Sequence, residues 1–154
     1  MDGGIDIKAL VTYDSVYGNT EKVAKAMGEA LGEGAEVRHA DQVDPAEMGS
    51  LDLIIVGSPT HGGRPTKPVS SLLGKIKSNA LQGTIVGAFD TRSPKRWVKI
   101  FGFAAPKIAG KLKKKGGTLA GEPEGFFVDD TEGPLSKGEL ERAAGWAKEV
   151  AGSE

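Results

Sequence analysis

The 154-residue sequence predicts an α/β fold, a three-layer, doubly wound parallel sheet of five strands. Short apolar runs that suit buried parallel strands alternate with segments whose apolar residues recur at helical spacing. Loops rich in glycine and hydroxyl groups follow three of these runs, and ligands of such sheets bind beyond the carboxyl ends of the strands. The length suits one compact domain, which we expect to span residues 1–154.

The first half of the chain supplies three of the five strands. In order, the predicted elements are a mostly apolar strand at Ile5–Tyr13, a helix at Glu21–Leu31, a short strand at Ala35–Ala40, a loop with at most one helical turn at DPAEM, and a strand at Leu51–Val56. The last of these, LDLIIV, is the strongest core strand, and it ends at Gly57 before the loop SPTHGGRPTKP.

The second half continues the alternation. Its predicted elements are a helix at Pro68–Lys77, a strand at Thr84–Phe89, a loop at DTRSP, a helix at Pro106–Lys115, a strand at Thr118–Ala120 that resumes at Phe126–Val128, and a terminal helix at Lys137–Ala151. Pro106 breaks or kinks any earlier helix, so the regular part starts there. Gly116 and Gly117 form a plausible C-terminal stop for that helix.

Composition excludes several classes of chemistry. The chain has no cysteine, which rules out disulfides, thiolate metal sites, cysteine nucleophiles and cysteine-ligated iron–sulfur clusters. Redox chemistry would therefore need a bound organic cofactor, and we assign no catalytic residue and no metal ligand. No apolar run approaches the roughly 18 residues of a membrane span. The amino terminus shows no leader, so we expect a cytoplasmic location.

The net charge of −1 hides an asymmetry. Between Arg92 and Lys115 the chain carries nine Lys and Arg residues and no Asp or Glu, which leaves 11 cations against 21 acids elsewhere. This basic segment is either a solvated helix face or a docking surface for an acidic partner.

The stretch DSVYGNT lies in the loop between the predicted first strand and the predicted first helix. It offers the hydroxyls of Ser15, Tyr17 and Thr20, the amide of Asn19 and backbone N–H groups, without a Lys or Arg. Such a junction binds anions, and neutral donors suit a phosphate that is held but not transferred. P-loop and GxGxxG patterns are absent. The paired acids of a phosphoacceptor domain and the cysteine of a small phosphatase are also missing.

DSVYGNTEKVA resembles the phosphate loop of flavodoxins, and GSPTHGG resembles the next flavin-contacting loop of that family. The resemblance covers essentially the whole chain in length, element order and loop position. It implies a flavodoxin-like sheet of order 2-1-3-4-5, one non-covalent FMN, and transfer of one electron at a time between redox partner proteins.

The motifs also imply which residues bind the cofactor. Those around the FMN phosphate are Ser15, Val16, Tyr17, Gly18, Asn19 and Thr20, and those facing the isoalloxazine are Pro59, Thr60, His61, Gly62 and Gly63. In the family, the peptide matching Gly62 flips so that its carbonyl accepts a hydrogen bond from reduced N5, and glycine permits both orientations. Two alternatives stay open: Gly62-Gly63 is a plain turn, and His61 is merely solvated.

The third loop, FDTRSPKRW, departs from the family pattern because it is basic and lacks glycine. Asp90, Thr91 and Arg92 occupy the strand end. Trp97 stands nearest the position of the stacking tyrosine, where it either stacks on the flavin or packs in the core. Arg64 and Arg92 would lie at the flavin's edge, which predicts either a less negative potential for the second reduction step or a partner of different charge.

Three functions fit these features. The favoured one is an FMN electron carrier, rather than an enzyme with its own substrate, that docks acidic redox partners on segment 92–115. The alternative is a small NAD(P)H-dependent flavin or quinone reductase, in which Arg64, Arg92 or Arg96 holds a nucleotide phosphate. The third is a module without cofactor that binds nucleic acid or an anionic membrane through KRWVKIFGF. The overall acidic chain disfavours nucleic acid, and no inserted segment builds a second substrate pocket.

Overall fold

The computed structural model describes residues 7–93, 102–130 and 132–152. Its parallel sheet has the strand order β2-β1-β3-β4-β5, and a further strand, β6, pairs with β4. The elements are β1 (Ala9–Tyr13), α1 (Asn19–Leu31), β2 (Ala35–His39), η1 (Ala40–Gln42), η2 (Pro45–Ser50), β3 (Leu53–Pro59), α2 (Lys67–Lys75), β4 (Ile85–Arg92), α3 (Ala104–Lys114), β5 (Thr118–Leu119), β6 (Glu124–Phe127) and α4 (Glu139–Ala151). The predicted doubly wound fold and its strand order are confirmed.

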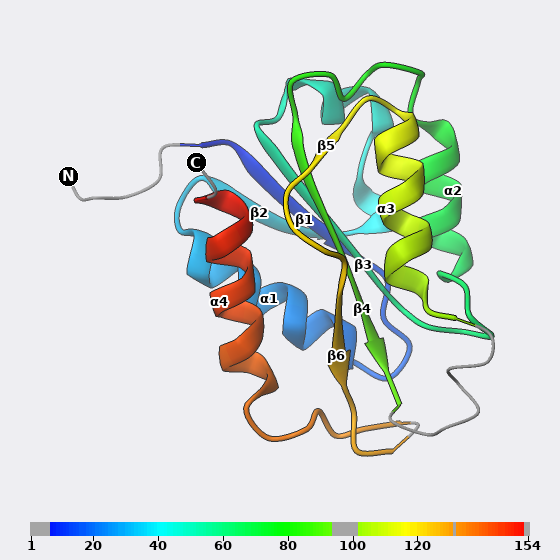
Figure 1. Ribbon diagram of the computed structural model, residues 1–154, viewed down its shortest axis with the longest axis vertical. Helices are drawn as coiled ribbons and strands as arrows, with labels where there is room; N and C mark the ends of the chain where they lie inside the picture. The colour runs from blue at the N-terminus through cyan, green and yellow to red at the C-terminus, as the bar shows by residue number, and fades with distance from the viewer. Residues whose placement is uncertain (1–6, 94–101, 131, 153–154) are drawn as a thin grey trace.

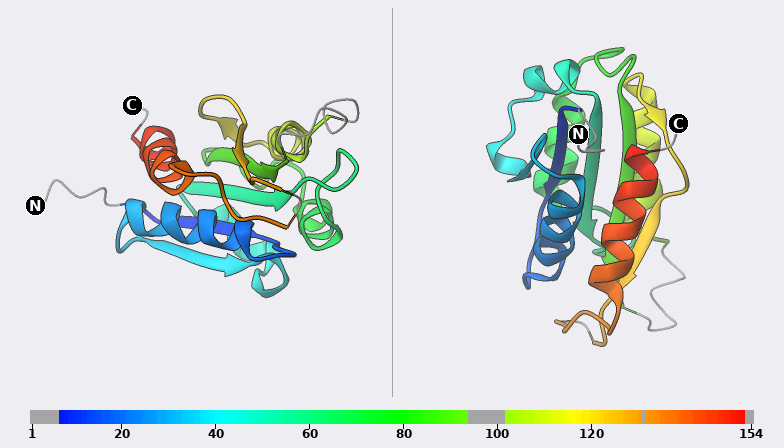
Figure 2. Two further views of the ribbon diagram at one scale, coloured as in Figure 1. Left: turned by 90° about the horizontal axis from the view of Figure 1, so that it is seen from below. Right: turned by 90° about the vertical axis from the view of Figure 1, so that its left-hand side faces the viewer.

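Helices α1 and α4 cover one face of the sheet, and α2 and α3 cover the other (Figures 1 and 2). Each face has its own apolar core. Under α1 and α4, Trp146 packs edge-on against Phe89 and Phe126, with ring centroids 6.4 and 6.2 Å apart. Under α2 and α3, fully buried side chains such as Leu73 and Ile108 meet the opposite face of the sheet. Parallel sheets require this two-sided cover because both of their faces are apolar.

Strands β3 and β4 run further than the apolar pattern predicts. Asp90, Thr91 and Arg92, expected in a loop, continue β4, because they pair with β6 and because β3 also extends to Pro59 beside Thr91. The expected loop at DTRSP is therefore wrong for its first three residues. The apolar residues end at Phe89, but Asp90 and Thr91 are still buried, and backbone pairing on both sides keeps the chain extended.

The last position of the sheet is shared by two short strands. β5 pairs with Ile85 and Val86, whereas β6 pairs with the carboxyl half of β4, from Phe89 to Arg92. The sequence predicted this interruption, with β6 two residues earlier than the expected start at Phe126.

Other boundaries differ slightly from the prediction. The DPAEM region and its flanks form two 3₁₀ helices, η1 and η2, where we expected a loop. Helix α3 starts at Ala104, before Pro106, because N–H groups in a first helical turn have no partner to lose. Residues 5 and 6 of the expected first strand lie outside the described residues, and β1 itself begins at Ala9.

None of the helices in the described part of the chain has the length and apolar character that a bilayer crossing requires.

Candidate functional site

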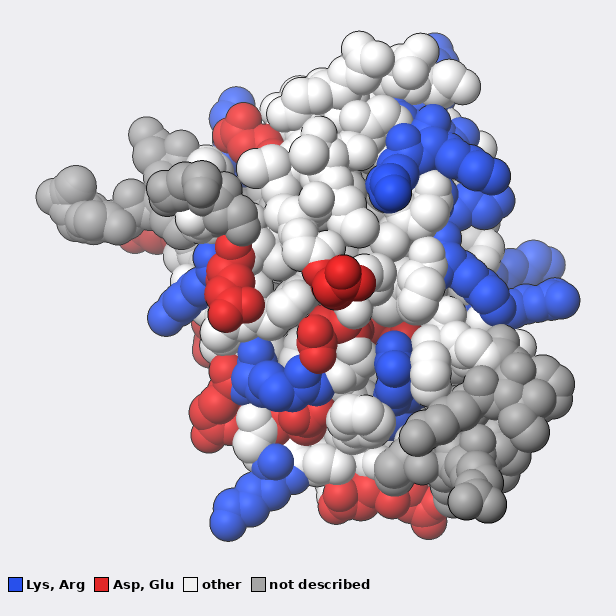
Figure 3. All heavy atoms as spheres, viewed as in Figure 1, with Lys and Arg blue, Asp and Glu red and all other residues white. Residues whose placement is uncertain are grey.

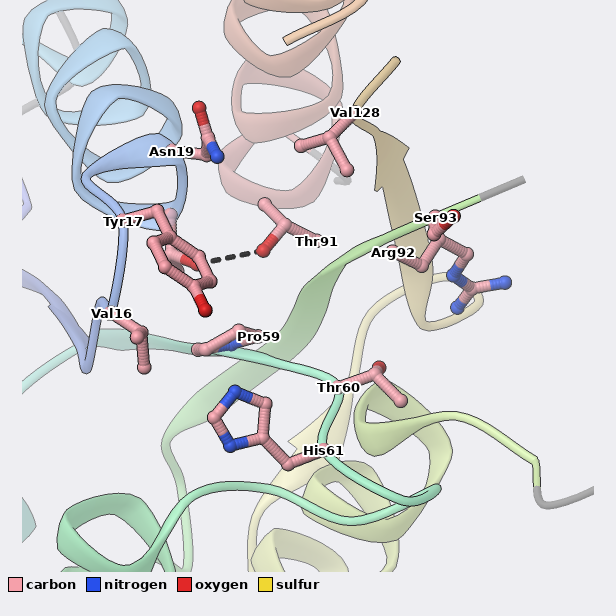
Figure 4. A pocket seen from close by; sticks show the side chains of 11 residues that line it. Val16, Tyr17, Asn19, Pro59, Thr60, His61, Thr91, Arg92, Ser93 and Val128 are labelled. Atoms are coloured by element: carbon pink, nitrogen blue, oxygen red, sulfur yellow. Dashed lines mark hydrogen bonds between the residues drawn. The ribbon is translucent and has the colours of Figure 1, made fainter. Parts of the chain in front are cut away.

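The carboxyl ends of β1, β3, β4 and β6 meet at one edge of the sheet, and a cavity of about 150 Å³ opens there (Figure 4). Its lining residues are Val16, Tyr17, Asn19, Thr20, Pro59, Thr60, His61, Thr91, Arg92, Ser93 and Val128. Nine of these were expected from the sequence to contact a cofactor. The structure therefore brings together three loops that are far apart along the chain.

The loop after β1 is shaped as an anion cradle. Gly18 adopts φ +92°, in the left-handed region that favours glycine, and delivers the chain into α1 at Asn19. The Gly18 N–H donates to Ser15 Oγ at 3.0 Å, which closes the loop on itself. Among the described residues no side chain caps α1 at Gly18. The first turn of the helix therefore presents its N–H groups and dipole to a ligand.

Two long-range contacts fix this loop in place. The buried hydroxyls of Thr20 and Thr91 share a hydrogen bond of 2.7 Å, which joins α1 to the end of β4. Asn19 Nδ2 donates to the carbonyl of Glu132 at 3.1 Å and thereby ties α1 to the segment after β6. The phosphate loop and the neighbouring loops are thus positioned relative to one another by contacts within the protein.

The loop after β3 ends in a tight hairpin. His61 and Arg64 exchange two backbone hydrogen bonds of 2.9 and 3.0 Å, with Gly62 at φ +57° and Gly63 at φ +80° between them. Two central residues with positive φ define a type I′ turn, which explains both glycines. The Lys107 ammonium donates to the Gly63 carbonyl. In Figure 4, Tyr17 and His61 lie on either side of Pro59 at the cavity.

Asp90, which is fully buried, and Arg92, which lines the cavity and is partly buried, form an ion pair. Asp90 is fully buried and accepts from Arg92 Nε at 2.7 Å, from Arg92 Nη2 at 2.9 Å and from the Ala105 N–H at 2.8 Å. The Arg92 guanidinium lies 3.5 Å from the ring centroid of Phe103 and is turned away from Tyr17 and His61 (Figure 4). Its charge is offset by Asp90, so Arg92 brings little free positive charge to the cavity.

A histidine that the sequence did not single out supports the phosphate loop. His39, at the end of β2, contacts Asp14 with Nε2 and Oδ1 2.7 Å apart, and its Nδ1 accepts the Asp41 N–H at 3.1 Å. This pattern places the ring hydrogen on Nε2, which donates to the carboxylate. Asp14 is the first residue of the loop between β1 and α1, and His39 holds its carboxylate in a fixed position.

Two nearby groups have shifted acidities. The pKa of Glu21, in the first turn of α1, is lowered because Lys25 donates a hydrogen bond to it and adds a positive charge. Burial raises the pKa of Tyr13, and the negative charge of Glu21, 3.4 Å from the Tyr13 hydroxyl, raises it further. Both shifts keep Glu21 ionised and Tyr13 neutral around pH 7.

The remaining expected residues have different places. Ser15 and Gly18 shape the phosphate loop and Gly62 and Gly63 form the turn, and none of the four lines the cavity, nor does Asp90. Trp97 lies outside the described residues.

The sequence missed two lining residues, Ser93 and Val128. Val128 directly follows β6, so the rule that ligands bind at the carboxyl ends of parallel strands could have found it.

The cavity suits FMN in its donors and its surfaces. Neutral hydroxyl, amide and backbone donors at the start of α1 match a phosphate, and the apolar faces of Val16, Pro59 and Val128 match a flat ring. At about 150 Å³ the cavity is smaller than the roughly 300–1,000 Å³ of typical ligand pockets, so a bound flavin would be only partly enclosed.

Curated proteins of similar sequence are much longer than this chain. A putative diflavin flavoprotein A 2 from Thermosynechococcus vestitus is 34% identical over 124 residues, which cover 76% of this chain and 20% of that protein. The rubredoxin-oxygen oxidoreductase of Megalodesulfovibrio gigas is 31% identical over 122 residues, covering 69% of this chain and 30% of that protein. The chain thus matches only a fifth to a third of these relatives.

Solved structures match the chain over nearly its full length. Oxidised flavodoxin 2 from Bacillus cereus superposes with a TM-score of 0.78 at 22% identity and covers 96% of this chain and 99% of its own. A flavodoxin from the domain Archaea gives 0.76 at 23% identity, with 94% and 96% covered. Identities this low show the fold alone.

The family model described as Flavodoxin matches residues 11–146. Together with the flavoprotein relatives, this match supports FMN as the cofactor. The chain belongs to the flavodoxin family.

Proposed function

We propose that this chain is an FMN-binding electron-transfer protein that carries one electron at a time between redox partners. The observation that carries the proposal is the continuity of the neutral anion cradle at the start of α1 with the cavity beside the glycine turn. FMN, when bound, supplies the reversible uptake and release of electrons. The residues of the chain hold it, orient it and limit the access of water.

Each loop has a separate part in this proposal. The loop 15–20 binds the phosphate through the N–H groups of the first turn of α1 and through side-chain hydroxyls. Tyr17 and His61, on either side of Pro59, contact the ring system. Following the resemblance, the Gly62–Gly63 peptide would turn over, and the Gly62 carbonyl would then accept a hydrogen bond from the flavin ring.

The proposal includes an acidic partner. The basic segment 92–115, of which residues 94–101 lie outside the described residues, would attract an acidic protein surface. One relative is named a rubredoxin-oxygen oxidoreductase, so a rubredoxin is a suitable first partner to test. A single-domain organisation over residues 1–154 and a cytoplasmic location also belong to this proposal.

The test is direct. The purified chain should be yellow, should release FMN on denaturation, and should bind added FMN more tightly than riboflavin, which lacks the phosphate. A colourless protein that takes up no FMN in a calorimeter would refute the proposal.

Mixing the holoprotein with NADH or NADPH without oxygen distinguishes the electron carrier from the reductase, because only a reductase is reduced directly. Arg92 is already paired with Asp90, so it is not free to hold a nucleotide phosphate.

A further inference from the structure

The charges of this chain are divided between two stretches of its sequence. From Leu53 to Gly121 the sequence has 13 Lys and Arg residues and one acid, Asp90, while the rest has 7 cations and 20 acids. Asp90 is fully buried and paired with Arg92, so it contributes nothing to the surface. Lys and Arg gather at the right-hand edge of Figure 3, over α2 and α3, while Asp and Glu lie at the centre, the bottom and the left, with Lys and Arg among them.

A cavity of about 470 Å³ lies within this basic layer. It is lined by Arg64, Pro65, Ser70, Leu73, Lys107 and Lys111, and so includes no Asp or Glu in the described part of the chain. Lys107 and Lys111 stand one helical turn apart and share a face of α3. Three cations therefore surround a hollow that also has an apolar wall.

This cavity is physically joined to the flavin turn. Arg64 is both a lining residue and the last residue of the His61–Arg64 hairpin. The Lys107 ammonium donates to the carbonyl of Gly63, in the middle of the same turn. A negative group entering the cavity would compete with this carbonyl for Lys107.

We propose that the basic cavity between α2 and α3 is the docking site for an acidic segment of a partner protein, whose carboxylates bind Arg64, Lys107 and Lys111. This inference rests on the proposed electron-transfer function, because docking here brings the partner next to the flavin turn. Charge complementarity selects the occupant: the described residues that line the cavity include cations and no acid. None of these described lining residues is aromatic, so they offer no ring on which a nucleic-acid base could stack, which favours a peptide over a single strand.

Docking also acts on the turn. When a carboxylate draws Lys107 away, the Gly63 carbonyl loses its cationic donor and the hairpin gains freedom. Coupling of this kind is reciprocal, so a change in the turn alters the affinity for the acidic segment by the same factor. The interaction between exposed charges also weakens as salt is added.

The experiment uses the FMN-loaded full chain and a hexaglutamate peptide as the probe, with hexaglutamine as the neutral control. Calorimetry measures binding at low and high salt for the wild type, Lys107→Gln, Lys111→Gln and Lys148→Gln. Lys148 is an exposed lysine on α4, in the other layer, and serves as the matched control. We expect salt-sensitive binding that weakens about two- to fivefold in each α3 variant and is unchanged in Lys148→Gln.

A second readout tests the coupling. Hexaglutamate should perturb the visible flavin spectrum of the wild type and of Lys111→Gln at saturation, but not that of Lys107→Gln. The inference is overturned if the FMN-loaded protein ignores the peptide, if Lys148→Gln weakens binding equally, or if a DNA duplex binds more tightly with the same dependence on Lys107 and Lys111. A chain that fails to bind FMN refutes the proposed function, while calorimetry on that chain still reports on the cavity.

Discussion

Replacing Gly63 with alanine tests how the flavin turn works. In the type I′ turn both central residues have positive φ, at +57° for Gly62 and +80° for Gly63. Turning over the peptide between them gives a type II′ turn, in which only the first central residue keeps positive φ. The closing hydrogen bonds between His61 and Arg64 are compatible with both turns. Gly63→Ala should therefore destabilise the observed type I′ turn but not the flipped type II′ turn.

The size of the effect follows from the backbone. A non-glycine residue in the left-handed region costs about 1–2 kcal/mol. A tenfold change in an equilibrium constant corresponds to 1.36 kcal/mol and, for transfer of one electron, to 59 mV. The penalty of about 1–2 kcal/mol therefore equals a shift of about 40–90 mV in the reduction potential. If the reduced flavin selects the flipped peptide, Gly63→Ala should raise the potential of the first reduction step by that amount.

Gly62→Ala is the matched comparison. Apart from its chain neighbours, no atom of the described residues lies within 4 Å of a Cβ built at Gly62, so the cost of alanine there is conformational. The first central position of a type II′ turn is a glycine position, and alanine there opposes the flipped turn more than the observed one. This variant should lower the potential of the first step.

Anaerobic redox titration of the FMN-loaded wild type and both variants measures these shifts. Circular dichroism of the proteins without FMN verifies that each variant is folded. The reasoning is refuted if both variants shift the potential in the same direction, or if Gly63→Ala leaves it unchanged.

Three further predictions concern the supports of the site. Thr20→Val leaves the Thr91 hydroxyl buried without its partner and should reduce the free energy of unfolding in urea by about 1–3 kcal/mol, whereas Thr20→Ser should reduce it less. Gly18→Ala places a side chain at φ +92°, which costs about 1–2 kcal/mol in the conformation seen here. It should weaken FMN binding by about 5- to 30-fold in a fluorescence titration. An unchanged affinity would show that the loop does not need this conformation. Glu139→Gln should cost about 1.5–3 kcal/mol at pH 7, because hydrogen bonds from Arg142 lower the pKa of Glu139 below its usual 4.5. The difference from wild type should shrink as the pH falls below that value, since a depressed carboxylate stabilises the fold only while ionised; a gap that is constant with pH contradicts this.

Much of the fold is visible in the sequence because local patterns encode it. A short run such as LDLIIV, rich in β-branched residues and followed by Gly57, favours a buried strand, and Val23 and Met27 mark the buried side of α1. The position of the glycine- and hydroxyl-rich loop between β1 and α1 was also visible, because it separates an apolar run from a segment with helical spacing. The end of β4 was misjudged because its last residues are polar.

Asp90 and Arg92 show why polar residues at the end of β4 made its length hard to predict from the sequence. A buried carboxylate in a strand is tolerated only where cations and N–H groups satisfy it, and those partners come from Arg92 and α3. The residues around Asp90 in the sequence do not indicate that its carboxylate accepts a hydrogen bond from the Ala105 N–H, fifteen residues away. From the sequence we expected Arg92 to bring a free positive charge to the flavin's edge, but in the structure it is paired with Asp90.

The sequence by itself determined the alternation of strands and helices, the glycine- and hydroxyl-rich loop before α1, and the absence of cysteine, because each depends on residue types and their spacing. Only the tertiary structure decided which charges remain free beside the flavin turn and which are cancelled. It also joined the Gly63 carbonyl to Lys107, forty-four residues further along the chain. Such contacts follow from how the layers pack, and packing brings together residues that no local pattern relates.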